Sequence, residues 1–187
     1  MNTFPLTPPL DNRFRLVVAP HAAWQDMLQL AAGLAQQGPL RIFDGGNRTN
    51  VYFLARHIRR CTPLVDEYLE NIRLARAFTC YQMLHLLNNA PANQQPLLVL
   101  DFLATFYDEN VSLPEAQRLL TRALREMDRL RRRAPLVVSV RSTAPNLERT
   151  ILLETLAARA DEVINLDLAQ LSPTSAPAPE AQRSFPF

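Results

Sequence analysis

The sequence predicts an α/β fold in which helices flank a mainly parallel sheet. Two short runs, LLVLD at 97–101 and LVVSV at 136–140, are apolar along nearly their whole length instead of alternating with polar residues. Continuous apolar strands of this length are typical of parallel sheets that are covered on both faces. Stretches with a helical spacing of apolar residues separate the expected strands, and there is no internal repeat. Strands that alternate with helices in this way indicate layered α/β architecture.

Local signals place the boundaries of the expected elements. Gly38 and Pro39 end the first helix, because neither residue continues a helix well. Thr79 is suited to cap the start of a helix, and Pro114 suits the opening turn of a long one. Strands are expected at residues 14–19, 40–44, 71–78, 97–101, 136–140 and 162–166. Helices are expected at residues 22–37, 50–60, 79–88, 114–133 and 147–159.

Length and composition indicate one globular domain. The chain has 187 residues, of which 48% are hydrophobic, and this is enough to build a sizeable core. We expect the core domain at residues 13–169. Residues 1–12 carry three prolines and little periodicity, so we expect them to be flexible. Residues 170–187 form a tail rich in Pro, Ser and Ala that we expect to be disordered.

The sequence does not indicate a membrane protein, an exported protein or a metalloprotein. No apolar run approaches the roughly 18–20 residues of a membrane span, and the N-terminus lacks the pattern of a signal peptide. We therefore expect a cytoplasmic protein. Cys61 and Cys80 are expected as free thiols, and His21, His57 and His85 have no partner at metal-ligand spacing. The net charge of +2 is too small to indicate nucleic-acid binding by itself.

The chain contains no lysine, and all 20 of its basic residues are arginine. Codon bias in a genome rich in G and C would produce the same composition. A phosphate-binding P-loop, GxxxxGK[ST], needs glycines whose backbone surrounds the phosphates and a lysine that reaches them. The four glycines, Gly33, Gly38, Gly45 and Gly46, do not form that pattern. The sequence therefore predicts that the chain has no standard P-loop.

Four segments of the expected core follow one another in a recognisable order. Residues 71–78 read NIRLARAF and lead into a helix, and residues 40–58 read as a strand, a turn and a helix. LLVLD ends in an Asp, and LVVSVR precedes a short polar loop. In this order the segments resemble the RecA/RadA-type recombinase family, with its N-(I/V)-x-x-A-R-A-(F/Y) strand, its Walker B strand and the strand before its second DNA-binding loop. The resemblance covers about residues 14–168 and implies a RecA-like three-layer core.

The resemblance also implies a phosphate slot after the first strand, but the residue types for phosphoryl transfer are missing there. The slot has no glycine and no lysine, it has no Ser or Thr at its end, and Gly46 stands where the family has its catalytic Glu. Asp101 matches the Walker B Asp, although an Asp at this place also suits the capping of the following turn. We therefore expect a pseudo-ATPase without catalytic residues, metal or cofactor. The slot consists of Ala19, Pro20, His21, Ala22, Ala23 and Trp24, together with Gly46.

Clusters of arginine indicate two candidate DNA contacts. Three consecutive arginines extend an arginine stripe at the end of the long helix, and two more flank the short loop that the resemblance equates with the second DNA-binding loop. Arginine is well suited to bidentate phosphate contacts. For the stripe, the alternative is a solvated helix face that nearby acids neutralise. The candidate residues are Arg131, Arg132, Arg133, Arg141 and Arg149.

The resemblance implies a non-catalytic RecA/RadA-like paralogue that serves as an accessory or mediator in DNA recombination and repair. Its expected partners are a RecA/RadA-type recombinase or another paralogue, with single-stranded DNA as a further candidate. Two alternatives stay open. One is a cell-division inhibitor of the SOS response with an inactive RecA-like fold, and the other is an atypical ATPase completed by a partner subunit. Fold alone does not decide among these functions.

Overall fold

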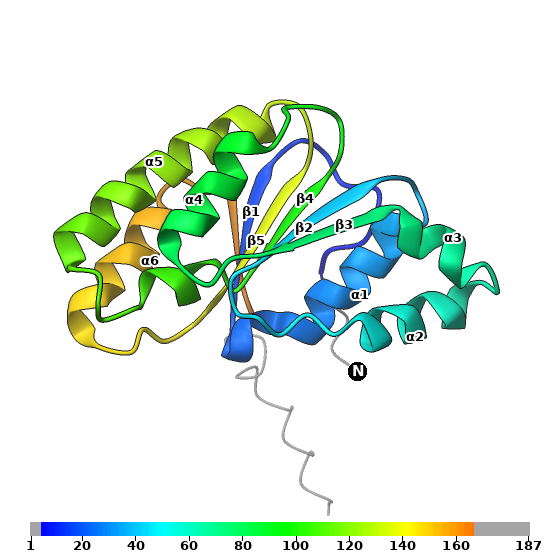
Figure 1. Cartoon of the computed structure of the whole chain (residues 1–187), viewed down its shortest axis with the longest axis horizontal. Helices are drawn as coiled ribbons and strands as arrows, with labels where there is room; N and C mark the ends of the chain where they lie inside the picture. The colour runs from blue at the N-terminus through cyan, green and yellow to red at the C-terminus, as the bar shows by residue number, and fades with distance from the viewer. Residues whose placement is uncertain (1–4, 167–187) are drawn as a thin grey trace, which may run out of the picture.

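The computed structural model describes residues 5–166, which form a six-stranded sheet between two layers of helices (Figure 1). All neighbouring strands pair in parallel, in the order β3-β2-β4-β5-β1-β6. This architecture confirms the predicted α/β fold and is consistent with a RecA-like three-layer core. The strands are β1 (Phe14–Ala19), β2 (Leu40–Asp44), β3 (Ile72–Arg76), β4 (Leu97–Leu100), β5 (Leu136–Arg141) and β6 (Glu162–Asn165).

Three helices cover each face of the sheet, as Figure 1 shows. The layer on the right of that view contains α1 (Trp24–Ala35), α2 (Val51–Cys61) and α3 (Val65–Glu70). The layer on the left contains α4 (Cys80–Asn89), α5 (Leu113–Arg131) and α6 (Thr150–Ala157). Three short 3-10 segments follow β1, β4 and β5, namely η1 (Pro20–Ala23), η2 (Phe102–Phe106) and η3 (Leu147–Arg149).

The core consists of two apolar clusters, one on each face of the sheet. Successive side chains of a strand point to opposite faces. In β1, Phe14, Leu16 and Val18 therefore join the cluster with α4, α5 and α6, whereas Val17 joins the cluster with α1 and α2. Every residue of β1 is buried. This burial on both faces is the reason why the central strands have continuous apolar sequences.

Element boundaries differ from the sequence predictions at a few places. The first helix begins at Trp24 and not at residue 22, because His21 and Ala22 have left-handed backbone angles. The helix α3 was not predicted, since its six residues are too few to display a helical period. The Thr79 cap is confirmed, because its hydroxyl oxygen accepts a hydrogen bond from the Gln82 backbone N–H at 3.2 Å.

The first described residues contact the domain that follows them. Leu6 is buried in the cluster on the α1 side, and the Pro8 ring lies close to Gly33 of α1. These contacts involve part of the segment that the sequence predicts to be flexible. Residues 1–4 and the predicted disordered tail at 170–187 lie outside the described residues. Within residues 5–166, no helix is long and apolar enough to cross a membrane.

Candidate functional site

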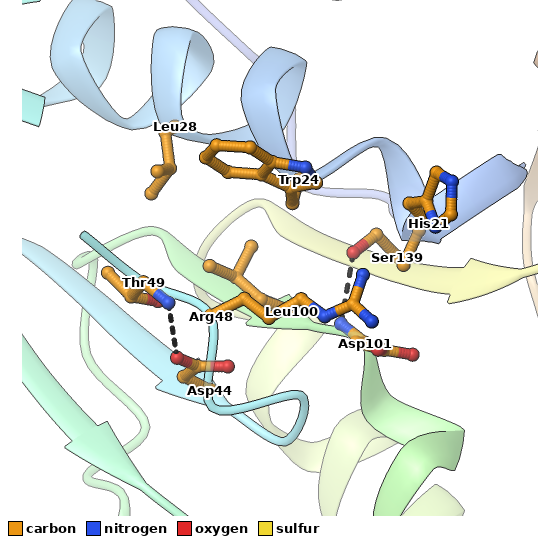
Figure 2. Close-up of a pocket in the computed structure, with 10 residues that line it drawn as sticks. His21, Trp24, Leu28, Asp44, Arg48, Thr49, Leu100, Asp101 and Ser139 are labelled. Atoms are coloured by element: carbon orange, nitrogen blue, oxygen red, sulfur yellow. Dashed lines mark hydrogen bonds between the residues drawn. The ribbon is translucent and has the colours of Figure 1, made fainter. Parts of the chain in front are cut away.

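The carboxyl ends of the parallel strands meet at one edge of the sheet, and a small cavity lies there (Figure 2). Its volume is about 10 Å³, enough for roughly one water molecule. Sites for small molecules usually measure about 300–1,000 Å³. The walls come from the turn after β1, the end of β2 and the ends of β4 and β5. They include His21, Ala22, Trp24, Asp44, Arg48, Thr49, Leu100, Asp101 and Ser139.

The turn between β1 and α1 has an unusual backbone. Three consecutive residues, His21, Ala22 and Ala23, have φ angles of 52°, 56° and 47°. For residues other than glycine, the left-handed region costs roughly 1–2 kcal/mol each. Such strain persists where the surrounding structure enforces it, and it clusters at functional sites. This turn stands where the resemblance to RecA/RadA-type recombinases implies a phosphate slot.

Trp24 closes the same side of the cavity with its indole ring. It is the first residue of α1, and its ring packs against Phe53 of α2 with ring centroids 5.2 Å apart. Phe53 in turn packs against His57, with ring centroids 4.6 Å apart. The indole therefore belongs to an aromatic cluster between α1 and α2. The indole forms part of the wall of the cavity.

Asp101 is a buried carboxylate, and an arginine from the neighbouring strand neutralises its charge. The residue is 4% exposed, and its Oδ2 accepts hydrogen bonds from Nε and Nη2 of Arg141 at 2.9 and 2.6 Å. Its backbone N–H donates to the Ser139 hydroxyl at 3.1 Å. Although Asp101 directly precedes η2, its side chain makes no capping hydrogen bond there. The Asp101 carboxylate is therefore held by an internal ion pair and does not cap the turn.

Gly46 packs directly against the Asp101 side chain. A Cβ atom added at Gly46 would lie 2.7 Å from Oδ2 and 2.8 Å from Cβ of Asp101, closer than Cβ atoms normally approach other atoms. A Glu at this position, as in active members of the resembled family, would require Asp101 to move. The packing of this site thus excludes the side chain that would position an attacking water.

Three buried side-chain oxygens have no hydrogen-bond partner within the described part of the chain: Thr49 Oγ1, Asp101 Oδ1 and the Tyr107 hydroxyl. Burial, together with the nearby Asp101 charge, raises the pKa of Tyr107 to about 12, while Arg141 acts in the opposite direction. The phenol therefore stays protonated at neutral pH. In residues 5–166, no group of three or more His, Cys, Asp or Glu side chains is arranged to hold a metal ion.

The structure brings the slot residues, Gly46 and Asp101 together at one edge, but it separates the candidate DNA contacts. Arg131 lies at the end of α5, where its guanidinium pairs with Asp128 and Asp161. α5 leads to the start of β5, whereas Arg141 is the last residue of that strand. A strand of six residues is roughly 20 Å long, so Arg141 lies about that far from the end of α5. Arg132 and Arg133 lie beside Arg131 and are exposed. The five arginines therefore do not form one surface.

Arg149 has a structural role. It is 6% exposed, and its guanidinium donates to the carbonyl oxygens of Phe106 at 2.5 Å and Val111 at 2.6 Å. The side chain thereby ties the start of α6 to the loop that follows η2. Because these contacts bury the guanidinium, Arg149 does not present it to a DNA strand. Arg141 is likewise engaged, since it neutralises Asp101.

Four residues that line the cavity were not predicted from the sequence, although the sequence pattern could have indicated two of them. Asp44 ends LRIFD as Asp101 ends LLVLD, so parallel pairing of β2 and β4 brings the two acids near each other. Ser139 is a polar residue inside an apolar strand, and buried polar residues in such runs are informative. Thr49, whose backbone N–H donates to Asp44 Oδ2 at 2.8 Å, and Arg48 lie in an irregular loop with no distinctive pattern.

No protein-family model matches the chain, and no curated protein shows a significant match to its sequence. The class of the protein is therefore defined by its fold and its site. It is a three-layer α/β core with a parallel sheet, consistent with a RecA-like core, and the cavity at the carboxyl edge of the sheet measures only about 10 Å³.

Proposed function

We propose that this chain is a non-catalytic RecA/RadA-like paralogue that acts as an accessory or mediator in DNA recombination and repair. The proposal rests on the small size of the cavity at the expected nucleotide slot. A nucleotide needs donors around its phosphates and a cation beside them. Here the cavity measures about 10 Å³, and the Asp101 carboxylate already forms an ion pair with Arg141. Such a core would be retained for the surfaces that it offers to other macromolecules.

The recombinase class is supported by the sequence segments and by the arrangement of the strands that contain them. β1, which leads into the slot, and β4, which leads to Asp101, lie on either side of β5. This strand order is compatible with the proposal, because His21 and Trp24 of the expected slot line the same cavity as Asp101.

Titration of the purified chain with ATP and Mg²⁺ tests the non-catalytic part of the proposal. We expect no binding heat in calorimetry and no rise in melting temperature at millimolar ATP. A ligand present at 100 times its Kd stabilises the folded state by about 2.7 kcal/mol, so micromolar binding would be obvious. Binding of that strength would show that the slot assignment is wrong and would favour the atypical ATPase.

Co-purification from the native host, followed by mass spectrometry, tests the proposed partners. We expect a RecA/RadA-type recombinase or another paralogue in the recovered complex. Recovery of a tubulin-like division protein would instead support the SOS division inhibitor. A heat-denatured sample that has lost its circular-dichroism spectrum, used as bait in the same way as the folded chain, is the control, because a surface-dependent contact requires the folded chain.

A further inference from the structure

The outer face of α2 is rich in arginine. Its inner face contributes Leu54 and Ile58 to the core, whereas Tyr52, Arg56, Arg59 and Arg60 are exposed. The spacings of four, three and one residues place these side chains on one side of the helix. Arg76 ends β3 and donates to the carbonyl oxygen of Thr49, two residues before the helix. We call Tyr52, Arg56, Arg59, Arg60 and Arg76 the α2 arginine face.

These arginines have no acidic partners. In the opposite helical layer, Arg118, Arg129 and Arg131 of α5 and Arg159, just after α6, form ion pairs with nearby carboxylates. Other exposed arginines of that layer, such as Arg122 and Arg125, form none among the described residues. Among the described residues, no arginine of the α2 arginine face forms an ion pair within 4 Å. The adjacent α3 carries the exposed acids Asp66, Glu67 and Glu70, and they too leave these arginines unpaired. The α2 arginine face is thus a group of exposed positive charges that no carboxylate of the described residues neutralises.

Like charges lie close to one another on this layer. The pKa of His57 is lowered, first by burial and then by the repulsion of Arg60 and Arg56. Repulsion of this kind is relieved when a polyanion binds and brings negative charge to the surface.

Exposed aromatic rings lie among these arginines. Tyr52 is 87% exposed on the first turn of α2, and Phe78 is 63% exposed just after β3. The two chain segments are tied together, because Arg76 Nη2 donates to the Thr49 carbonyl oxygen at 3.0 Å. Aromatic rings beside unpaired arginines are the combination that binds single strands, since rings stack on bases and guanidinium groups contact phosphates.

We propose that the α2 arginine face binds single-stranded nucleic acid, with arginines on the phosphates and Tyr52 stacked on a base. The surface lies on the opposite helical layer from α5, at the end of which the sequence suggested three of the DNA contacts (Figure 1). It deepens the proposed role in recombination and rests on that role for its biological setting. Its test needs only the purified chain and an oligonucleotide, so either proposal can fail without the other.

Fluorescence anisotropy with a labelled 20-nucleotide dT strand tests the surface. The variant R56Q/R59Q/R60Q removes three exposed, unpaired charges from α2. The matched control R122Q/R125Q/R132Q removes three exposed charges from α5 and the residue after it, without breaking an ion pair in the described chain. We expect the α2 variant to bind at least about tenfold more weakly and the control to stay within about twofold of the parent. We expect the salt slope to fall by about 2, because each phosphate contact on a single strand contributes about 0.7.

Two further comparisons separate base stacking from general attraction to polyanions. Tyr52→Ala should weaken binding to the strand several-fold, whereas Tyr52→Phe should retain it, because stacking needs the ring and not the hydroxyl. Melting curves confirm that each variant folds. Equal losses in the two triple variants would overturn the proposal. Equal affinity for duplex and single strand would also overturn it, as would a Tyr52→Ala variant that binds as tightly as the parent. Competition by poly-glutamate as effective as that by unlabelled dT would likewise overturn it, because it would indicate an acidic protein partner.

Discussion

The ion pair between Arg141 and Asp101 neutralises the only acid that the chain shares with the Walker B position of the resembled family. Replacement of Arg141 by Ala leaves the Asp101 carboxylate buried without its counter-charge. We expect a loss of about 2 kcal/mol in the free energy of unfolding, measured by urea denaturation. The loss should be smaller than for a fully buried pair, because the Arg141 side chain is 37% exposed and water can replace it.

A double-mutant cycle is the control for this prediction. Asp101→Asn removes the charge that Arg141 neutralises, so the second substitution should then cost much less. We expect an interaction energy of at least about 1 kcal/mol between the two sites. Strictly additive losses would mean that the ion pair contributes nothing to stability.

At His21 the backbone, and not the side chain, determines the expected effect. The residue is exposed and has a φ of 52°. His21→Gly should stabilise the protein by about 0.5 kcal/mol, because relief of left-handed strain exceeds the added entropy of the unfolded chain. His21→Ala removes the same imidazole but keeps a Cβ atom, so it should not stabilise. Chemical denaturation compares the two, and an equal gain from Ala would show that removal of the imidazole is responsible.

At the scale of elements, the strands were predictable and the turn after β1 was not. LLVLD and LVVSV are continuous apolar runs because β4 and β5 are covered on both faces, so their composition reveals their burial. Ala22 and Ala23 gave no warning of left-handed angles, and His21 is the one residue of the turn whose type is enriched in that region. Its conformation results from tertiary contacts around the cavity.

The Arg149 side chain stabilises the loop at residues 107–112, which joins η2 to α5. Its guanidinium binds the Phe106 and Val111 carbonyl oxygens, so Arg149→Met should destabilise the protein by about 2–3 kcal/mol. Amide hydrogen exchange should accelerate most in residues 107–112. Arg122→Met is the control, because this exposed arginine on α5 forms no ion pair in the described chain, and it should shift stability by less than about 0.5 kcal/mol. Uniform exchange after Arg149→Met would contradict a local role.

At the scale of the whole molecule, the titration of Tyr107 makes the free energy of unfolding depend on pH in the alkaline range. Its pKa rises from 10 in the unfolded chain to about 12 in the folded protein. The stabilisation is fully present below pH 10 and is lost as pH rises from 10 to 12, at up to about 1.4 kcal/mol per pH unit, since only the unfolded state releases the proton there.

Comparison with Tyr107→Phe isolates this contribution from that of the other tyrosines. The variant should be at least as stable as the parent at pH 8, because it removes a buried hydroxyl that has no partner in the described chain. Between pH 10 and 12 it should lose less stability than the parent. Parallel unfolding curves for the two proteins across that range would show that Tyr107 titrates normally.

The sequence indicates that no standard P-loop is present, but it does not reveal the contacts of Asp101. Residues 19–24 contain neither lysine nor glycine, which is what predicts the missing P-loop. The partner of Asp101 could not be found in that way, because Arg141 is 40 residues away and meets it only when β4 and β5 pair. Strand order is a property of the whole sheet, so contacts between strand ends become visible only with the structure.

The position of β1 in the sheet has a consequence for protein synthesis. β1 leaves the ribosome before the other described strands, yet its neighbours in the sheet are β5 and β6, with Phe14 opposite Leu136 and Arg15 opposite Glu162. Its apolar side chains therefore cannot be buried between these strands until most of the domain has been translated, which takes several seconds at about 5–20 residues per second. During that interval the nascent chain exposes an unpaired strand that is prone to aggregation, and chaperones have their best opportunity to bind it.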